Sequence, residues 1–272
     1  MCNILKFFSK SPVSVTLVWL LGVIIIWELG ASYIESVKRT PENVLPHIHQ
    51  ILASFTSQKK VSQGQTAFQI VASNAGMTLT RAGIGFIIGA GLGFLLALAM
   101  RLSSIIEKTA FPYLMLIQMI PILGMAPIVL AVTKDIGVSR IVIAAILTFY
   151  PVSTSTLAGF KAVDKEKYDL MRICAANKFQ LYTKTLIPSC VPYFFTGLKI
   201  SAPMAITASI LVDTLQGDGG LGCMLSQSLK LAMSIYVFWQ IVVFSAVIGI
   251  MSSYLMGVIE KLLSPHKWRV RA

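Results

Sequence analysis

Long apolar runs dominate this sequence and limit the folds open to it. Six of them have about the twenty residues that an α-helix needs to cross the hydrocarbon core of a bilayer. With 56% hydrophobic and only 12% charged residues, the composition excludes an ordinary water-soluble globular domain. We therefore expect an all-α membrane protein. The expected spans are Val13–Tyr33, Ala82–Met100, Phe111–Val132 with breaks at Pro121 and Pro127, Arg140–Phe160, Pro188–Val212 and Tyr236–Leu263.

The segments between these runs set the expected topology. The run Val13–Tyr33 follows Lys6 and Lys10, lacks a small-residue cleavage site and is too long for a cleaved signal peptide, so it predicts a true first span with the N-terminus inside. Alternation then places both termini in the cytoplasm and 14 of the 23 lysines and arginines on the inner side, as the positive-inside rule expects. These loops account for the net charge of +12, and no nucleic-acid partner is needed.

A polar stretch, Glu35–Thr66, separates the first two spans and is expected outside the membrane. Its apolar residues in Ile48–Phe55 recur at helical spacing, which predicts a short interfacial helix. The segment Ala67–Arg81 is amphipathic and leads into the second span. We accordingly divide the chain into an N-terminal span with its outer loop, residues 1–66, and a core of spans two to six, residues 67–272.

The longest inner loop, Lys161–Ile187, contains helix signals of its own. Asp164 is placed to cap a helix from Lys165 to Cys174, and Asn177 starts a second helix with Gln180 in a capping-box position. The loop is too apolar for a freely solvated linker. We expect two short helices joined by a tight turn, an elbow that docks on a partner; a solvated charged loop is the alternative.

This loop resembles the cytoplasmic EAA loop of ABC-transporter permease subunits. Asp169-Leu170-Met171, Ala175 and Leu186-Ile187-Pro188 stand at that family's Glu-Ala-Ala, Gly and Ile-x-Leu-Pro positions. The flanks are more similar than the motif and resemble the nitrate/sulfonate/taurine branch in Leu157–Asp164, Gln180–Tyr182, Val191–Ile200, Ile120–Leu123, Ala126-Pro127 and Gly219–Gly222. The resemblance extends from about residue 70 to the C-terminus.

Membership of that branch implies a type I ABC importer permease of about six spans in the plasma (inner) membrane of a bacterium. A second copy of the chain would complete the pathway as a homodimer. Two ATP-binding subunits would dock on the elbows, and an extracytoplasmic solute-binding protein would deliver the cargo. This chain would then bind no cofactor or metal and hold no catalytic residue, because ATP and Mg²⁺ would sit on the ATPase subunits.

The implied cargo is a small polar compound of the sulfonate, taurine or nitrate type. The same machinery importing a vitamin, a thiamine-pyrimidine precursor or riboflavin is the alternative. The residues that would couple transport to the ATPase are Asp164, Asp169, Leu170, Met171, Ala175, Asn177, Phe179 and Pro188. Ala175 replaces the family's glycine. Because a left-handed conformation costs alanine more free energy than it costs glycine, we expect the turn to use Ala176 or Asn177 instead.

Polar groups within the spans are candidates for the solute pathway, since polarity in hydrocarbon usually faces a bundle interior or a cavity. Nearby prolines free backbone carbonyls that such a route could use. Lys199 and Asp213 match a basic and an acidic position of the family, whereas Gln118 stands where many relatives have Arg. The structural alternatives are helix–helix hydrogen bonding, ion pairing or snorkelling, and an ordinary loop after Asp213. The candidates are Gln118, Pro121, Ser153, Thr154, Ser155, Lys199 and Asp213.

Other function classes lack their signature residues in this sequence. It has no G-x-x-x-x-G-K-[ST], H-E-x-x-H or G-x-S-x-G motif, which argues against ATP hydrolysis and intramembrane catalysis. Gly85, Gly89 and Gly93 lie four apart in an apolar run, which predicts close helix packing. We interpret His47 and His49 as solvated and the four cysteines as unpaired. An ion-coupled secondary transporter, the alternative class, would show mid-membrane acidic residues and an inverted repeat, and neither is evident.

Overall fold

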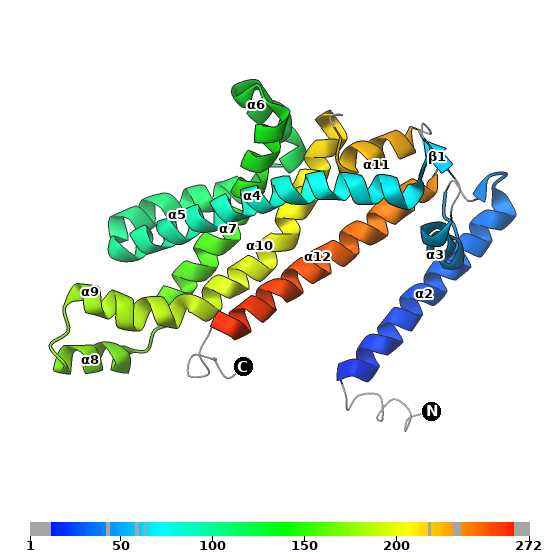
Figure 1. Ribbon diagram of the computed structural model, residues 1–272. Helices are drawn as coiled ribbons and strands as arrows, with labels where there is room; N and C mark the ends of the chain where they lie inside the picture. The colour runs from blue at the N-terminus through cyan, green and yellow to red at the C-terminus, as the bar shows by residue number, and fades with distance from the viewer. Residues whose placement is uncertain are drawn as a thin grey trace. The chain divides into compact units, whose positions relative to one another are not determined.

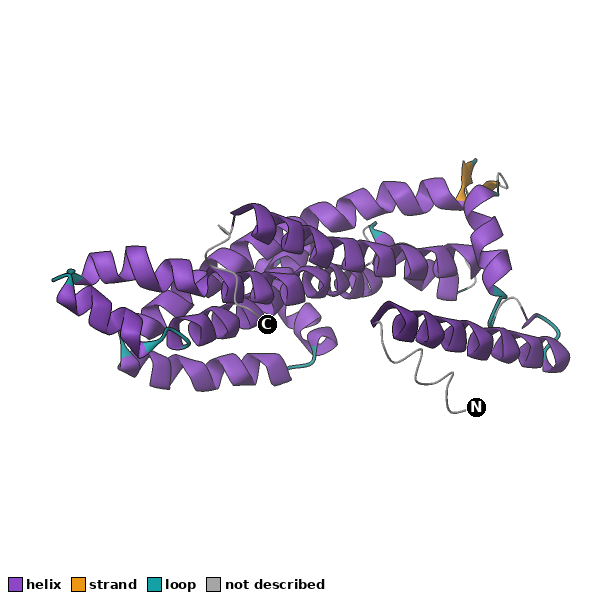
Figure 2. Cartoon of the chain, turned by 90° about the horizontal axis from the view of Figure 1, so that it is seen from below, coloured by secondary structure: helices purple, strands orange, loops and turns teal. Residues whose placement is uncertain are grey.

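The computed structural model describes residues 12–41, 44–57, 60–62, 64–216, 219–230 and 235–263. Lys6, Lys10, Cys2 and His266 lie outside these residues. Helices make up almost all of the described chain, and the described strands form one small hairpin (Figure 2). The chain separates into two compact units, one of residues 1–70 and 228–240 and the other of residues 71–227 and 241–272.

The first unit contains the first apolar helix, α2 (Pro12–Val37), and a short helix, α3 (Ile48–Thr56), where the spacing predicts one. A hairpin of β1 (Lys60–Ser62) and β2 (Gln65–Thr66) follows, which the sequence did not indicate because its strands are only three and two residues long. Gly64 between them has a φ of +77°, a left-handed conformation that glycine adopts without steric cost.

The beginning of the last helix, α12 (Ile235–Leu263), also belongs to this first unit. The ring of Trp239 packs edge-on against Trp27 of α2, with 5.0 Å between their centroids. Gln240 donates from Nε2 to the hydroxyl of Ser54 in α3 at 2.9 Å, and both side chains are buried. Aromatic packing and one buried hydrogen bond therefore join the three helical segments of this unit.

The second unit carries all or most of each remaining helix, and the α-helices among them are labelled in Figure 1. They are α4 (Ala67–Leu102, which begins in the first unit), α5 (Ser104–Met119), α6 (Ile122–Thr133), α7 (Ile136–Lys161), α8 (Lys165–Ile173), α9 (Lys178–Leu181), the π-helical η2 (Tyr182–Leu186), α10 (Ile187–Gln216), α11 (Leu221–Leu229) and the rest of α12. Five described helices are long and apolar enough to cross a membrane, or six spans result if α5 and α6 count as one broken span. The expectation of an all-α membrane protein with about six spans is confirmed.

The third predicted span is sharply bent. The axes of α5 and α6 differ by 106°, and Pro121 stands at the start of α6. A residue before proline is sterically pushed out of the helical region, and Ile120 is indeed extended, with φ −76° and ψ 125°. Pro127 lies inside α6 and does not interrupt it, so only one of the two expected breaks occurs.

Close helix contacts define the interior of the second unit. A Cβ atom added to Gly85 would lie 2.6 Å from Cβ of Ala144, and one added to Gly93 would lie 2.9 Å from the carbonyl oxygen of Phe149. The glycine stripe of α4 therefore packs against the backbone of α7, as predicted. Gly197 of α10 gives a second close approach, because a Cβ there would lie 3.0 Å from the carbonyl oxygen of Pro151 in α7.

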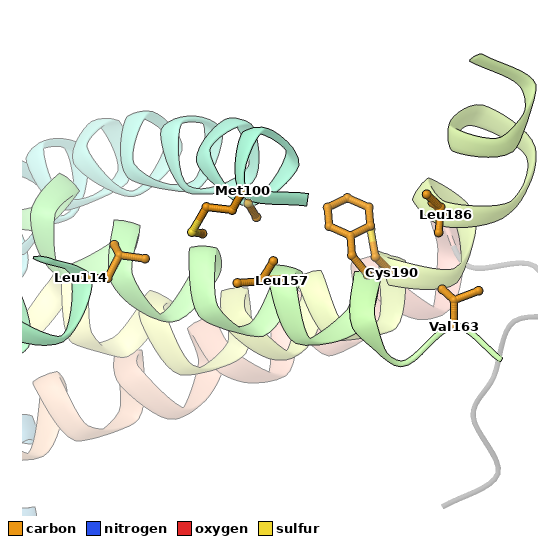
Figure 3. Close-up of a cluster of buried hydrophobic side chains, with 8 residues drawn as sticks. Met100, Leu114, Leu157, Val163, Leu186 and Cys190 are labelled. Carbon is orange, nitrogen blue, oxygen red and sulfur yellow. The ribbon is translucent and has the colours of Figure 1, made fainter. Parts of the chain in front are cut away.

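A buried apolar cluster lies where α4, α5, α7 and the first turns of α10 meet (Figure 3). Its labelled members are Met100, Leu114, Leu157, Val163, Leu186 and Cys190. Val163 lies two residues before α8, and Leu186 is the last residue of η2, which follows α9. Each end of the elbow is thus anchored in the core of the unit.

Candidate functional site

The turn between α8 and α9 is built on Ala175. Its φ is +49°, the left-handed conformation, so the expectation that Ala176 or Asn177 would take this role is wrong. The amide of Ala176 donates to the carbonyl of Met171 at 3.0 Å, and the amide of Ala175 donates to that of Arg172 at 2.9 Å. This is the Schellman pattern. Two hydrogen bonds of about 1 kcal/mol each offset the roughly 1–2 kcal/mol that a left-handed alanine costs.

The second half of the elbow begins at the predicted capping box. The Asn177 side chain accepts from the amide of Gln180 at 2.8 Å, and the Gln180 side chain accepts from the amide of Asn177 at 3.0 Å. From Lys178 the helix runs through η2 into α10 without a break. Pro188 cannot donate a hydrogen bond, and its ring crowds the carbonyl four residues back. The helix accommodates this with the widened, π-helical turn η2, in which the amide of Ile187 donates to the carbonyl of Tyr182.

The remaining coupling residues lie on or beside α8. Asp164 occupies the N-cap position but makes no capping hydrogen bond; its carboxylate lies 3.5 Å from Nζ of Lys167. Asp169 is exposed and lines a hollow of about 470 Å³ between the two arms of the elbow. Met171 and Leu181 line the same hollow. The elbow therefore presents a concave surface with both charged and apolar walls.

Three large apolar side chains of the elbow point outward. Leu170, Ile173 and Phe179 are 59%, 83% and 75% exposed. In contrast, the base of α8 is fastened to α4, because Arg101 donates to the hydroxyl of Tyr168 and its guanidinium lies 5.8 Å from the centre of that ring. A firmly attached elbow with an uncovered apolar surface is typical of a docking element.

A buried charge cluster lies at the other end of α10. Oδ1 of Asp213 is 2.6 Å from Nε of Arg140 in α7 and 3.9 Å from Nη1 of Arg81 in α4. The hydroxyl of Thr78 in α4 donates to Oδ2 of the same carboxylate at 2.8 Å. Asp213 and Arg140 have no exposed side-chain surface. One carboxylate thus joins three apolar helices and is shared by two guanidinium groups.

The glycine-rich segment before α11 is held to this cluster. The amide of Gly220, whose φ is +90°, donates to the side chain of Asn74, and the amide of Leu221 donates to the hydroxyl of Thr78, both at 2.9 Å. The carbonyl of Gly219 accepts from Arg140 at 3.4 Å. Gly217 and Asp218 lie outside the described residues, and the described part of this segment, Gly219 and Gly220, is a tightly bonded turn.

Lys199, the other charged pathway candidate, pairs with Glu260 of α12. The lysine side chain is 35% exposed and the glutamate 21%. Sequence reasoning did not identify Glu260, nor Arg81, Arg140 and Thr78 as partners of Asp213. The sequence did hold a signal for the partners of Asp213. The predicted topology puts the starts of spans two and four and the end of span five on the same side of the membrane.

The uncharged pathway candidates divide into two groups. Gln118 and Pro121 are exposed near the bend between α5 and α6. In α7, the hydroxyl of Ser153 donates to the carbonyl of Phe149 at 2.7 Å, and that of Thr154 donates to the carbonyl of Tyr150 at 2.9 Å. Ser155 is half-buried, and its Cβ faces Gly197 of α10. Ser153 and Thr154 thus bond within their own helix in this conformation, as serine and threonine commonly do.

The protein family whose description is binding-protein-dependent transport system inner membrane component matches residues 89–265. Among curated proteins, the chain is 28% identical over 249 residues to the formylaminopyrimidine transport permease protein ThiX of Halalkalibacterium halodurans, covering 92% of this chain and 93% of that one. It is 25% identical over 256 residues to the nitrate import permease protein NrtB of Leptolyngbya laminosa, covering 94% and 88%. It is 26% identical over 193 residues to the putative aliphatic sulfonates transport permease protein SsuC of Bacillus subtilis, covering 71% and 69%.

Two solved structures share the fold. An amino acid ABC transporter superposes with a TM-score of 0.61 at 21% identity, over 72% of this chain and 94% of that one. The inward-facing MetNI methionine ABC transporter also gives 0.61, at 15% identity, over 72% and 97%. Both carry the type I importer permease fold that the resemblance implies, and that expectation is confirmed.

The chain therefore belongs to the family of inner membrane components of binding-protein-dependent transport systems. Within it, the chain is an ABC importer permease of the nitrate/sulfonate branch, a multi-pass subunit of the inner membrane that works with ATPase and binding-protein partners.

Proposed function

We propose that two copies of this chain form the solute pathway of an ATP-driven importer, with both termini in the cytoplasm. Residues 161–188 form the elbow on which each of two ATPase subunits docks. ATP and Mg²⁺ bind those partners and not this chain. The observation that carries the proposal is the outward-facing Leu170, Ile173 and Phe179 on an elbow whose two ends are anchored in the core.

The helix that follows the elbow provides the mechanical link. From Ile187 to Asp213, α10 extends roughly 39 Å, the length of 26 helical rises. Its first residues adjoin the elbow and Asp213 joins the buried charge cluster. A displacement of the elbow when the ATPase subunits close is therefore passed along one helix to the turn before α11. Pro192 and Pro203 lie inside α10 and give it places to bend.

For the cargo we propose a small polar anion of the sulfonate or nitrate type. At the end of α10 the carboxylate of Asp213 pairs with Arg140, and Nη1 of Arg81 lies 3.9 Å from its Oδ1. In addition, Nη1 of Arg81 is buried and has no hydrogen-bond acceptor among the described residues. A guanidinium with an unused donor attracts an anion more than a neutral solute.

The first experiment tests the elbow. Membranes containing the chain, its ATPase and its binding protein are assayed for solute-stimulated ATP hydrolysis and for co-purification of the ATPase. Changing Asp169 to Lys together with Phe179 to Ala should abolish both. Lys108→Ala, a change at an exposed position of α5 outside the elbow, is the control and should leave both intact. Unchanged hydrolysis and co-purification in the double variant would remove the elbow from the mechanism.

The second experiment tests the cargo. Uptake of radiolabelled sulfonate, nitrate and a neutral aminopyrimidine is measured in vesicles that hold ATP. We expect uptake of an anion, and a loss of at least tenfold in Arg81→Gln at unchanged ATPase binding. Uptake of the aminopyrimidine alone would overturn the anion assignment and favour a cargo like that named for ThiX. Uptake that persists after ATP is exhausted while an ion gradient remains would instead favour a secondary transporter.

A further inference from the structure

Four side chains with metal-binding chemistry meet in the first unit. Glu28 of α2, His47 and His49 each place one ligand atom within 4.8 Å of the others. Nδ1 of His47 is 2.5 Å from Oε2 of Glu28, and Nε2 of the same ring is 3.3 Å from Oε2 of Glu35. The rings of His47 and His49 are tilted by 31°, with 5.4 Å between their centroids.

The backbone around this cluster is fixed by hydrogen bonds. The indole of Trp27 donates to the carbonyl of Pro46 at 3.1 Å, and the amide of Ile48 donates to Oε1 of Glu28 at 3.0 Å. The amide of His47 donates to the side chain of Gln50 at 3.0 Å. The start of α3 is thus held against α2, and the ligand atoms are placed by contacts that do not themselves require an ion.

We propose that Glu28, His47 and His49 bind one divalent transition-metal ion of the zinc class. Two imidazoles and one carboxylate form a ligand set that zinc accepts at about 2.0–2.2 Å, with a fourth position open to water. Hard cations such as Mg²⁺ and Ca²⁺ prefer oxygen ligands only. Ligand atoms of a tetrahedral zinc lie about 3.3 Å apart. Nδ1 of His47 and Oε2 of Glu28, which are 2.5 Å apart, therefore move about 0.8 Å further apart when the ion replaces the hydrogen between them.

Glu35 supports the site through His47 without binding the ion itself. Its carboxylate faces the ring nitrogen of His47 that points away from Glu28, which is the arrangement that fixes the orientation and the tautomer of a metal-binding histidine. A cavity of about 40 Å³ lined by Glu35, His47 and Gln50 adjoins the site and has room for a water molecule. The ion would fasten the loop before α3 to the first apolar helix.

Sequence reasoning interpreted the two histidines as solvated because they lie on a polar loop, and Glu28 lies 19 residues before His47. A His-x-His pair alone is common on polar loops. Only the return of the loop along α2 brings a carboxylate from within the apolar helix to the pair.

The test uses the full-length, untagged chain in detergent after removal of metals with a chelator. Titration calorimetry with Zn²⁺ should show one ion per chain. Affinity should fall at least tenfold in His49→Ala, an exposed position that leaves the Glu28–His47 pair intact, and also in Glu28→Gln. His266→Ala, a histidine outside the site, is the matched control and should bind as the parent does, and Mg²⁺ should not bind.

Two results would overturn the proposal. One is an absence of saturable Zn²⁺ binding in the folded parent chain. The other is equal affinity in the parent and in His49→Ala, which would show adventitious binding elsewhere. Thermal unfolding in the presence and absence of Zn²⁺ checks that each variant is folded, and a rise in Tm with zinc is expected in the parent and in His266→Ala but not in His49→Ala.

Discussion

Nε of Arg140 in α7 lies 2.6 Å from Oδ1 of Asp213 in α10, and neither side chain has exposed surface. The pair lies among apolar helices, where an ion without its partner is far more costly than in water. Arg81 and Thr78 of α4 add a second positive charge and a hydroxyl donor to the same carboxylate. The start of α7, the end of α10 and an interior segment of α4 are therefore fixed relative to one another by charge as well as by apolar packing.

Removing Arg140 should destabilise the chain by about 3 kcal/mol, because the buried carboxylate of Asp213 then keeps only Thr78 and the more distant Arg81 as partners. Thermal unfolding of Arg140→Met in detergent is the measurement. Lys161→Met breaks the partly exposed pair with Glu107 and should cost no more than about 1 kcal/mol. The double variant Arg140→Met with Asp213→Leu should be more stable than Arg140→Met alone; additive losses would show that the two side chains do not depend on each other.

Gly89→Ala should destabilise the packing of α4 on α7 by about 1–3 kcal/mol, as overpacking of a core does. A Cβ there would lie 2.7 Å from Cβ of Thr148 and would collide with the carbonyl oxygen of Ala145. Gly91→Ala is the matched control, because a Cβ at that position of α4 has no neighbour within 4 Å. The yield of monodisperse protein and its Tm should fall for Gly89→Ala only. Equal behaviour of both variants would argue against the close approach.

Ala175→Gly should stabilise the elbow by about 0.5–1 kcal/mol, since glycine avoids the cost of the left-handed conformation but loses more chain entropy. Hydrogen exchange of the Ala176 amide, which donates to Met171, reports this local stability and should slow by about two- to fivefold. Ala158→Gly, at an exposed position inside α7, should have the opposite sign. Faster exchange in Ala175→Gly would contradict the turn geometry.

Cys174 offers a direct check of the proposed orientation. It is exposed on the elbow, whereas Cys190 and Cys223 are buried in the described structure. In a Cys2→Ser background, a membrane-impermeant maleimide should label Cys174 in inside-out vesicles and not in right-side-out vesicles. Cys174→Ser should remove the labelling. Labelling from the outer face would reverse the proposed topology.

Local patterns were sufficient for the long apolar helices and for the start of each elbow helix. Apolar length predicts the spans, and residue type at the helix ends predicts α8 to within one residue of its C-terminus and the capping box of Asn177 and Gln180. The left-handed turn was misplaced because residue preference does not record the hydrogen bonds that stabilise it. The carbonyls of Met171 and Arg172 accept these bonds from the amides of Ala176 and Ala175. The widened turn before Pro188 likewise depends on the helix continuing on both sides.

The sequence by itself therefore determined how many apolar helices cross the membrane and where the elbow lies, because hydrophobic length and helix caps are properties of neighbouring residues. Only the tertiary structure decided which charges meet: Asp213 with Arg140, Lys199 with Glu260 and His47 with Glu28. Each pair comes from different segments of the chain. Their pairing follows from helix packing and, for His47 and Glu28, from the return of the loop along α2, which bring the partners within a few ångströms of each other.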